Sequence, residues 1–205
     1  MSLVAEVPPR LDLLPIGSGE ARTLPRGPIE RYDPAAGARW LPDNRRILFL
    51  AREKGHDLRV YLQDIDGGQP RAITPEKPFA YTPPGLAVSP EGTWVIFTTG
   101  NEEKFFAYPV DGGEPRAIAG LKQDDLPIVW SADGRSLFVY EVGRVPAQAY
   151  LTNLRTGERR LWKTFMPPDP AGVGVVDPTL TPDGRFYFYD YNRVLTELYV
   201  VDGVK

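Results

Sequence analysis

The sequence predicts an all-β fold of about four four-stranded antiparallel sheets, one for each repeat of the chain. Three observations lead to this prediction. Two different turn motifs alternate along most of the 205 residues, and short runs of β-branched and aromatic residues lie between them. No segment shows a sustained helical period with capping residues at its ends.

The first turn motif has proline or alanine, then an acidic residue, then glycine or asparagine. Its four copies are Leu41-Pro42-Asp43-Asn44, Ser89-Pro90-Glu91-Gly92, Ser131-Ala132-Asp133-Gly134 and Thr181-Pro182-Asp183-Gly184. The acidic positions of successive copies lie 42 to 50 residues apart, and an apolar run follows each copy. Glycine and asparagine tolerate a positive φ, so each copy predicts a tight hairpin turn.

The second motif is a glycine turn that leads to an arginine. Its copies contain Gly17-Ser18-Gly19, Asp66-Gly67-Gly68, Asp111-Gly112-Gly113 and Thr156-Gly157, and their arginines are Arg22, Arg71, Arg116 and Arg160. An apolar residue stands two positions after each arginine: Leu24, Ile73, Ile118 or Trp162. Because side chains alternate along a strand, each arginine and its apolar neighbour are predicted to share one face.

A period of about 40 to 50 residues with four strands in each repeat is typical of a β-propeller. A single four-stranded sheet cannot bury both faces, whereas sheets stacked around an axis bury each face against the next. The predicted blades are residues 38–74, 86–119, 127–163 and 178–201, in one domain or propeller fragment over residues 1–205.

The two ends do not complete a whole number of blades. The last repeat has predicted strands at Thr179-Leu180, 186–191 and 197–201 and lacks a fourth, whereas residues 11–24 supply strands without a blade. Residues 11–24 therefore either close the last blade or belong to an incomplete earlier one. In the second case the terminal strand edges would be unpaired, and the chain is expected to self-associate through them.

Composition excludes several classes of function. The chain has a formal net charge of −3 and no cysteine. The charge argues against a nucleic-acid surface, and the lack of cysteine excludes disulfides and thiolate metal sites. No apolar run is long enough for a membrane helix, so this chain is not expected to insert directly into a membrane.

No catalytic, cofactor-binding or metal-binding residue is assigned, and no cofactor is expected. The single histidine, His56, lies in a polar segment and is expected in a solvated loop. Gly17-Ser18-Gly19 lacks the full Gly-x-Ser-x-Gly pattern of a nucleophile elbow. The repeated acids Asp43, Glu91, Asp133 and Asp183 lie one blade apart, which favours a role in turns over a shared Ca²⁺ site. The acidic pairs Glu102-Glu103 and Asp124-Asp125 are expected on a solvated surface.

Two further sets of residues leave alternatives open. The four repeated arginines either pack along the outer strands and pair with nearby acids or form a surface for an anionic partner. Tyr187, Tyr189 and Tyr191 share one face of a strand by alternation and are expected in packing between blades, unless they are exposed as a binding patch.

The repeated phrase Pro-Asp-Gly, two apolar strands, then Asp-Gly-Gly-x-Pro-Arg resembles the WD-repeat-like blade of TolB-type propellers. The resemblance covers residues 11–205. Residues 189–205 are also similar to the C-terminus of propeller regions appended to some bacterial eukaryotic-like Ser/Thr kinases. This similarity implies a fragment of a larger, extracytoplasmic (periplasmic) protein. The pattern departs from the family at Asn44, where glycine is usual, and at Leu154-Arg155-Thr156-Gly157, which replaces Asp-Gly-Gly.

The function expected from this fold is non-enzymatic. The leading hypothesis is a module that binds or scaffolds a protein or peptide through loops at a blade edge or the central channel, an inference by analogy of fold. The alternative is a ligand-sensing regulatory region of a larger transmembrane Ser/Thr-kinase-like protein. An enzyme is disfavoured because one histidine offers few groups for a catalytic constellation.

Overall fold

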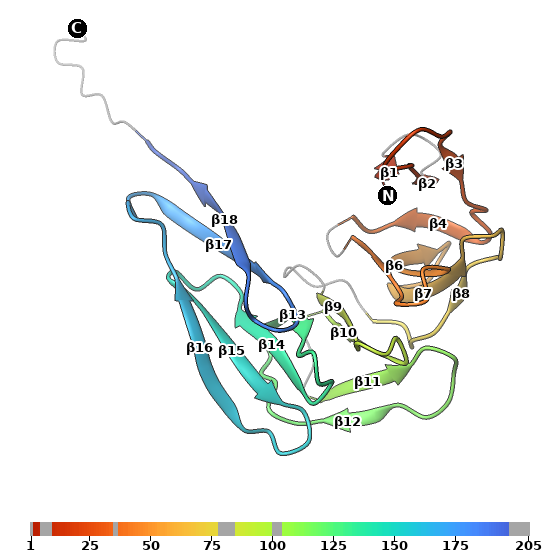
Figure 1. The fold of residues 1–205 in the computed structure, drawn as a ribbon. Helices are drawn as coiled ribbons and strands as arrows, with labels where there is room; N and C mark the ends of the chain where they lie inside the picture. The colour runs from red at the N-terminus through yellow and green to blue at the C-terminus, as the bar shows by residue number, and fades with distance from the viewer. Residues whose placement is uncertain (1, 5–9, 35–36, 78–84, 100–103, 197–205) are drawn as a thin grey trace, which may run out of the picture.

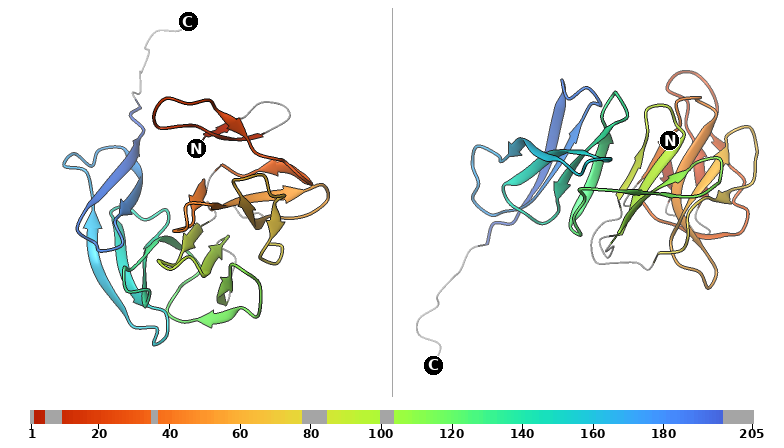
Figure 2. Two further views of the ribbon diagram at one scale, coloured as in Figure 1. Left: turned by 45° about the vertical axis from the view of Figure 1, so that its right-hand side comes forward. Right: turned by 90° about the horizontal axis from the view of Figure 1, so that it is seen from below.

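The computed structural model describes residues 2–4, 10–34, 37–77, 85–99 and 104–196. These residues form β-strands and no helix, so the predicted all-β class is confirmed. Five antiparallel sheets follow one another around an arc, with the first and the last at its two ends (Figures 1 and 2). This is the arrangement of a partial β-propeller. The described part of the chain has no helix long and apolar enough to span a membrane.

The sheets are numbered here in chain order. The first sheet contains β1 (Ser2–Val4), β2 (Arg10–Leu13) and β3 (Arg22–Thr23). The second contains β4 (Ile29–Tyr32), β5 (Ala38–Trp40), β6 (Arg46–Glu53), β7 (Arg59–Asp64) and β8 (Arg71–Ala72). The third contains β9 (Gly85–Val88), β10 (Trp94–Thr98), β11 (Phe105–Pro109) and β12 (Arg116–Ile118). The fourth contains β13 (Asp125–Trp130), β14 (Ser136–Glu141), β15 (Ala147–Asn153) and β16 (Arg159–Phe165). The fifth contains β17 (Val173–Leu180) and β18 (Tyr187–Arg193).

The third and fourth sheets are four-stranded meanders, in which each strand pairs with the next strand in the chain. Copies of the first turn motif join β9 to β10, β13 to β14 and β17 to β18. In the second sheet, Asn44 adopts a φ of 55°, so asparagine fills the left-handed position that glycine fills in the other copies. The departure at Asn44 therefore preserves the turn, because asparagine accepts this conformation better than other side chains.

The core consists of the interfaces between successive sheets, and strand alternation divides the side chains between them. On β6, Ile47 and Phe49 pack toward the first sheet, whereas Leu48 and Leu50 pack toward the third. All four side chains are buried. A central strand buried on both faces has an almost continuous apolar run, and for this reason the sequence Ile47–Leu50 lacks polar positions.

The later interfaces repeat this arrangement. Ile96 of the third sheet packs with Trp130 and Leu137 of the fourth. Tyr140 and Phe165 of the fourth sheet pack with Val176 of the fifth. Each sheet is thus stabilised mainly by its neighbours, as expected for a repeat protein with one continuous core.

The inner strands of the second and fifth sheets extend furthest beyond the ranges predicted from sequence, and both contain a bulge. The inner strand of the second sheet has two pieces, β4 and β5, and both pair with β6. The register shifts between Ile29 and Arg31 on β4 and between Val173 and Val175 on β17. A bulge interrupts the two-residue alternation, which removes the signal by which a strand is recognised in a sequence.

The N-terminal strands form a sheet of their own. β3 pairs with β2, and β2 pairs with β1. Leu11 and Leu24 from this sheet pack against Phe49 of the second sheet. No pairing between this sheet and β17 or β18 occurs among the described strands. The strand predicted at residues 197–201 lies outside the described residues, and so does the acidic pair Glu102-Glu103.

Candidate functional site

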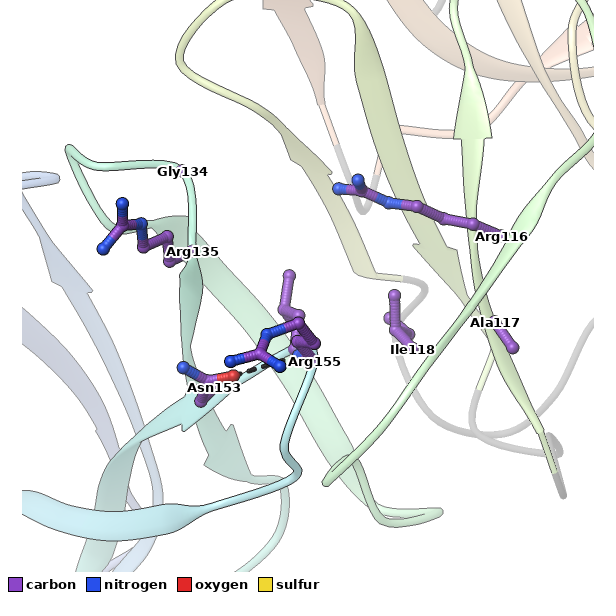
Figure 3. A pocket seen from close by; sticks show the side chains of 8 residues that line it. Arg116, Ala117, Ile118, Gly134, Arg135, Asn153 and Arg155 are labelled. Atoms are coloured by element: carbon purple, nitrogen blue, oxygen red, sulfur yellow. Dashed lines mark hydrogen bonds between the residues drawn. The ribbon is translucent and has the colours of Figure 1, made fainter.

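The candidate site is an arginine-lined pocket between the third and fourth sheets, with a volume of about 650 Å³ (Figure 3). One wall is β12, with Arg116, Ala117 and Ile118. The opposite side is formed by Gly134 and Arg135 from the turn before β14, by Asn153 at the end of β15, and by Leu154 and Arg155 from the turn that follows. The pocket therefore lies where two turns of one blade meet the outer strand of another.

The turn before β14 is shaped by its own acidic residue. Asp133 Oδ1 accepts hydrogen bonds from the Ser131 hydroxyl at 2.6 Å and from the backbone N–H of Arg135 at 3.0 Å. An aspartate whose carboxylate accepts a hydrogen bond from the backbone N–H two residues further along the chain is typical of tight turns. The Asp133 carboxylate contacts the backbone of Arg135 and is not within ion-pair distance of its guanidinium. Among the described residues, this guanidinium forms no ion pair, although its charge contributes to lowering the pKa of Asp133.

The turn after β15 is shaped in the same way by an asparagine. Asn153 Oδ1 accepts a hydrogen bond from the backbone N–H of Arg155 at 3.0 Å (Figure 3). The same oxygen accepts from the N–H of Thr156 at 2.9 Å. Gly157 then takes a φ of 74°. The replacement of Asp-Gly-Gly at this position thus keeps a turn, because asparagine supplies an equivalent acceptor.

Backbone hydrogen bonds hold the walls together. The N–H of Leu154 donates to the carbonyl of Arg135 at 3.1 Å, and the N–H of Ala119 donates to the carbonyl of Leu154 at 3.0 Å. The second of these bonds connects the end of β12 to the fourth sheet. Leu154 itself is buried in the interface between the sheets. The arginines are therefore presented by main chain that is fixed in place.

Arg116 is oriented by an aromatic ring. Its guanidinium carbon Cζ lies 4.3 Å from the ring centroid of Trp94, the first residue of β10. At this distance the cation is attracted to the ring face, with a typical strength of about 0.5–1 kcal/mol at an exposed site. The stacking orients the Arg116 guanidinium, which makes no hydrogen bond within the described part of the chain.

Carboxylates of Glu91 and Asp133 lie near Gly134 and Arg135 but form no ion pair with the arginines of the pocket. Among the described residues, no carboxylate lies within 4.0 Å of the guanidinium nitrogens of Arg116, Arg135 or Arg155, all of which are exposed. Other arginines do have such partners, for example Arg46 with Asp43 and Arg193 with Asp169. The pocket thus combines three guanidinium groups that have no ion-pair partner among the described residues with the apolar side chains of Ala117, Ile118 and Leu154.

The repeated arginines do not make the ion pairs that one sequence interpretation expected. Within the described residues, Arg22, Arg71, Arg116 and Arg160 have no carboxylate at ion-pair distance. Arg71 donates to the carbonyl of Val110 at 3.2 Å, and Arg116 stacks on Trp94. Arg71 and Arg116 therefore pack along the sheets, as the sequence interpretation expected, but they form no ion pair with an acidic residue among the described residues.

His56 lies in the exposed turn between β6 and β7. Its Nδ1 is 2.8 Å from Oε1 of Glu76, and the Arg59 guanidinium contacts the same oxygen. The other carboxylate oxygen, Oε2, accepts a hydrogen bond from the Asp57 N–H at 3.2 Å. The pKa of Glu76 is lowered, mainly by the hydrogen bond with His56. The hydrogen bond from the Asp57 N–H and the charge of Arg59 act in the same direction. These contacts tie the turn to the segment after β8 and place His56 on an exposed loop, as the sequence predicted.

The repeated acids occupy turns as predicted. Asp43, Asp133 and Asp183 each accept a hydrogen bond from the backbone N–H two residues on, at 2.9 to 3.0 Å. Glu91 instead accepts a hydrogen bond from the Thr93 hydroxyl at 3.1 Å.

In the part of the chain that the structure describes, no group of three or more His, Cys, Asp or Glu residues lies close enough together to hold a metal ion. Gly17–Gly19 lies in the exposed connection between β2 and β3.

The expectation for Asp124-Asp125 is wrong at Asp125. Asp125 is the first residue of β13, and its side chain is fully buried. It forms an ion pair with Arg159, which also lies 3.5 Å from Glu141 and stacks on Tyr150. The partner is 34 residues away along the chain, so no local pattern could reveal it.

The three tyrosines of β18 lie on the face toward the fourth sheet, where packing between blades was expected. The ring centroids of Tyr187 and Tyr189 lie 5.4 Å and 5.6 Å from that of Phe165. Tyr191 follows at 6.4 Å from Tyr189. Tyr187 and Tyr191 are nevertheless almost half exposed, so this packing is incomplete.

These observations define the class of protein: a β-propeller whose sheets pack face to face around an arc. Among solved structures, TolB from Acinetobacter baumannii matches with a TM-score of 0.61 and 17% identity, over 90% of this chain and 49% of that one. A putative TolB from Agrobacterium tumefaciens matches with a TM-score of 0.60 and 15% identity, over 87% and 61%.

The fold is therefore that of TolB-type β-propellers, as the sequence resemblance implied. The chain spans about half of the first TolB structure and about three-fifths of the second. No protein-family model and no curated protein matches the chain. Identity at this level establishes the fold alone, and the kinase resemblance stays a prediction.

Proposed function

We propose that the chain is a non-enzymatic propeller module that binds a protein or a peptide in the arginine-lined pocket. The observation that carries this proposal is the gathering of Arg116, Arg135 and Arg155 around one pocket without carboxylate partners among the described residues. Three arginines gathered around one pocket without ion-pair partners are poorly explained by stability, because like charges repel one another.

The pocket has the properties of a recognition site. Its volume of about 650 Å³ lies within the range of small-molecule and peptide pockets. Loops held on a rigid scaffold commonly carry binding residues. Arginine is enriched at the points of an interface that contribute most to affinity, because its planar group donates several hydrogen bonds in a fixed geometry.

The chemistry of the lining favours binding over catalysis. The described lining residues are three arginines, one asparagine, Ala117, Ile118, Gly134 and Leu154. Arginine remains protonated, and an asparagine amide takes no proton, so this set offers no general base and no activated nucleophile.

A second candidate is a ligand-sensing regulatory region of a larger transmembrane Ser/Thr-kinase-like protein. It is supported by the resemblance of residues 189–205 and by a pocket volume that also suits a small anionic molecule. The two candidates differ in whether a peptide or a small molecule fills the pocket.

Selection of random peptides displayed on phage tests the proposal. The chain is the bait, and a variant with Arg116→Ser, Arg135→Ser and Arg155→Ser is used for counter-selection. A matched control replaces three exposed arginines outside the pocket, with Arg22→Ser, Arg160→Ser and Arg185→Ser.

We expect enriched peptides to bind the wild type and the control variant, and to lose at least about tenfold in affinity for the pocket variant. Failure to enrich any peptide, or equal binding to all three proteins, would contradict the proposal. A screen of small anions that finds a ligand where peptides fail would favour the second candidate.

Self-association through the terminal strand edges is a separate proposal. Among the described strands, β1, β3, β17 and β18 each have one strand partner. Unpaired edges tend to pair with another chain. Light scattering behind size exclusion checks this point, and a monomer mass at every concentration would contradict it.

A further inference from the structure

We infer that the occupant of the arginine-lined pocket is an acidic peptide in extended conformation, which adds to the edge of β12 and pairs its carboxylates with the pocket arginines. The inference rests on the proposed function and specifies the chemistry of the partner. Two independent features of the pocket support it: the backbone of β12 and the charge opposite that strand.

The backbone of β12 borders the pocket. Arg116, Ala117 and Ile118 are consecutive strand residues, and all three line the cavity. Figure 3 shows Arg116 and Ile118 on one side of the strand and Ala117 on the other. Residues that point in opposite directions can line one pocket only if the main chain between them also faces it.

This backbone edge is available for pairing. β12 is the last strand of the third sheet and pairs only with β11 among the described strands. Pairing to the fourth sheet begins just beyond β12, where the N–H of Ala119 donates to Leu154. The free edge thus extends over three residues, about 10 Å of strand. An extended peptide can add to such an edge through main-chain hydrogen bonds.

The opposite side of the pocket supplies positive charge. Arg135 and Arg155 come from two turns of the fourth sheet, and Arg116 comes from β12 itself. A peptide strand along β12 would place alternate side chains on one face, about 7 Å apart. Glutamate or aspartate at these positions matches the planar donor fork of arginine, which binds carboxylates in a bidentate manner.

Other anions match fewer of these features. A single inorganic phosphate would occupy a small part of the pocket and would make no use of the β12 edge. A nucleic acid requires a wider basic surface, whereas this chain has a formal net charge of −3. An acidic peptide is the ligand class that uses both the strand edge and the arginines.

The test uses defined probes on the full chain. The first probe is a fluorescein-labelled peptide of four Glu-Thr repeats, with its ends blocked, and the second has Gln in place of every Glu. Fluorescence anisotropy at about 50 mM NaCl measures the dissociation constants, since higher salt screens exposed charges. The proteins are the wild type, the pocket variant with three arginines replaced, and the control variant at Arg22, Arg160 and Arg185.

We expect the Glu peptide to bind the wild type at least about tenfold tighter than the Gln peptide. The pocket variant should lose this preference, and the control variant should keep it. Equal affinity for both peptides, or an equal loss in both variants, would overturn the inference, because binding would then be independent of the carboxylates or of the pocket.

N-methylated peptides test the strand addition. An added strand bonds through alternate N–H groups, so methylation of either the Glu or the Thr residues should weaken binding by about tenfold, and methylation of the other set should not. If both methylated peptides bind like the parent, strand addition is wrong. If inorganic phosphate displaces the peptide at a concentration equal to the peptide's own dissociation constant, the pocket is a small-anion site and the inference is wrong.

The two experiments distinguish a failure of this inference from a failure of the proposed function. If phage selection yields pocket-dependent peptides that lack acidic residues and the Glu peptide does not bind, only the further inference fails. If neither the selected peptides nor the Glu peptide bind, the proposed function fails with it.

Discussion

The Tyr140 hydroxyl donates a hydrogen bond of 2.8 Å to Asp177 Oδ1 and so joins the fourth sheet to the fifth. Tyr140 lies on β14 and Asp177 on β17. We expect Tyr140→Phe to lower the free energy of unfolding by about 1–2 kcal/mol, since a hydrogen bond to a charged group is lost. Hydrogen exchange should show faster exchange of the β17 and β18 amides. Tyr187→Phe is the control, because that residue is 44% exposed and should change little.

The same contact predicts a loss of stability in alkali. Burial, then the hydrogen bond and charge of Asp177, raise the pKa of Tyr140 above its ordinary value. A raised pKa contributes stability that is complete below the unfolded value of about 10 and is lost as the pH rises above it. Urea unfolding between about pH 9 and 11 should show a steeper decline for the wild type than for Tyr140→Phe. Parallel declines would mean that Tyr140 is not the group responsible.

The buried ion pair of Asp125 and Arg159 predicts a large effect of one substitution. The Asp125 side chain is fully buried and that of Arg159 is 12% exposed. Arg159→Met leaves the buried carboxylate of Asp125 without its guanidinium partner, whereas Glu141 keeps Arg144 and Lys122. We expect a loss of about 3–5 kcal/mol. Arg160→Met, at the exposed neighbour, should be close to neutral.

A double-mutant cycle separates charge from packing at this pair. Asp125→Asn removes the charge that Arg159→Met leaves buried, so the double variant should be more stable than the sum of the two single effects predicts. Chemical denaturation of the four proteins measures the coupling. Additive effects would show that the loss comes from the packing of Arg159 on Tyr150.

The aspartates of the first turn motif predict a loss of stability in acid. The backbone N–H of Arg45 lowers the pKa of Asp43, and the Ser131 hydroxyl lowers that of Asp133. The Thr181 hydroxyl does the same for Asp183. A lowered pKa contributes stability above the unfolded value of about 3.9, and this contribution is lost as the pH falls through the folded value.

The combined variant Asp43→Asn, Asp133→Asn and Asp183→Asn should therefore lose less stability than the wild type between about pH 5 and pH 2.5. Asparagine keeps the acceptor oxygen of the turn but does not titrate in this range. Thermal unfolding at several pH values measures the difference. Identical pH profiles would mean that other carboxylates govern the acid transition.

Asn44 and Gly92 occupy equivalent positions of the first turn motif, but the free energy of unfolding should respond differently to asparagine at these two positions. Asn44 and Gly92 have φ values of 55° and 72°. Asn44→Gly should be nearly neutral, and Asn44→Ala should cost about 1 kcal/mol, because alanine is disfavoured at positive φ. A Cβ at Gly92 would lie 2.6 Å from Cδ of Pro42.

Gly92→Asn should therefore destabilise the protein by about 1–2 kcal/mol although asparagine accepts the backbone conformation. Urea unfolding of the three variants measures these effects. A neutral Gly92→Asn would show that the Pro42 ring moves aside at little cost.

Much of the fold was predictable because its signals are local. The copies of the first turn motif at Asp133 and Asp183 indicate where one strand ends and the next begins, and the run Ile47–Leu50 indicates a strand buried on both faces. The strand β4 and the first half of β17 were not predicted, because bulges at Ile29 and Val173 interrupt the alternation.

The pocket was only partly predictable. Arg116 belongs to a repeated motif, and an anionic partner was one interpretation of that motif. Arg135 directly follows the first turn motif, as Arg45 and Arg185 do in their copies, and nothing in the sequence distinguishes it from them. Arg155 belongs to no repeated pattern. Arg135 and Arg155 each stand two residues after a side chain that accepts a hydrogen bond from their backbone N–H. The burial of Asp125 was also missed, since its partner Arg159 is distant in the sequence.

The sequence by itself determined the repeat, the strands and the turn conformations of this protein. Those properties depend on side-chain alternation and on which residues accept a positive φ, and both are set within a few residues of chain. The tertiary structure decided that Arg116, Arg135 and Arg155 surround one pocket. It also decided that Asp125 is buried in an ion pair with Arg159. These relationships arise because the third sheet packs face to face on the fourth, and this packing determines which distant strands and turns meet.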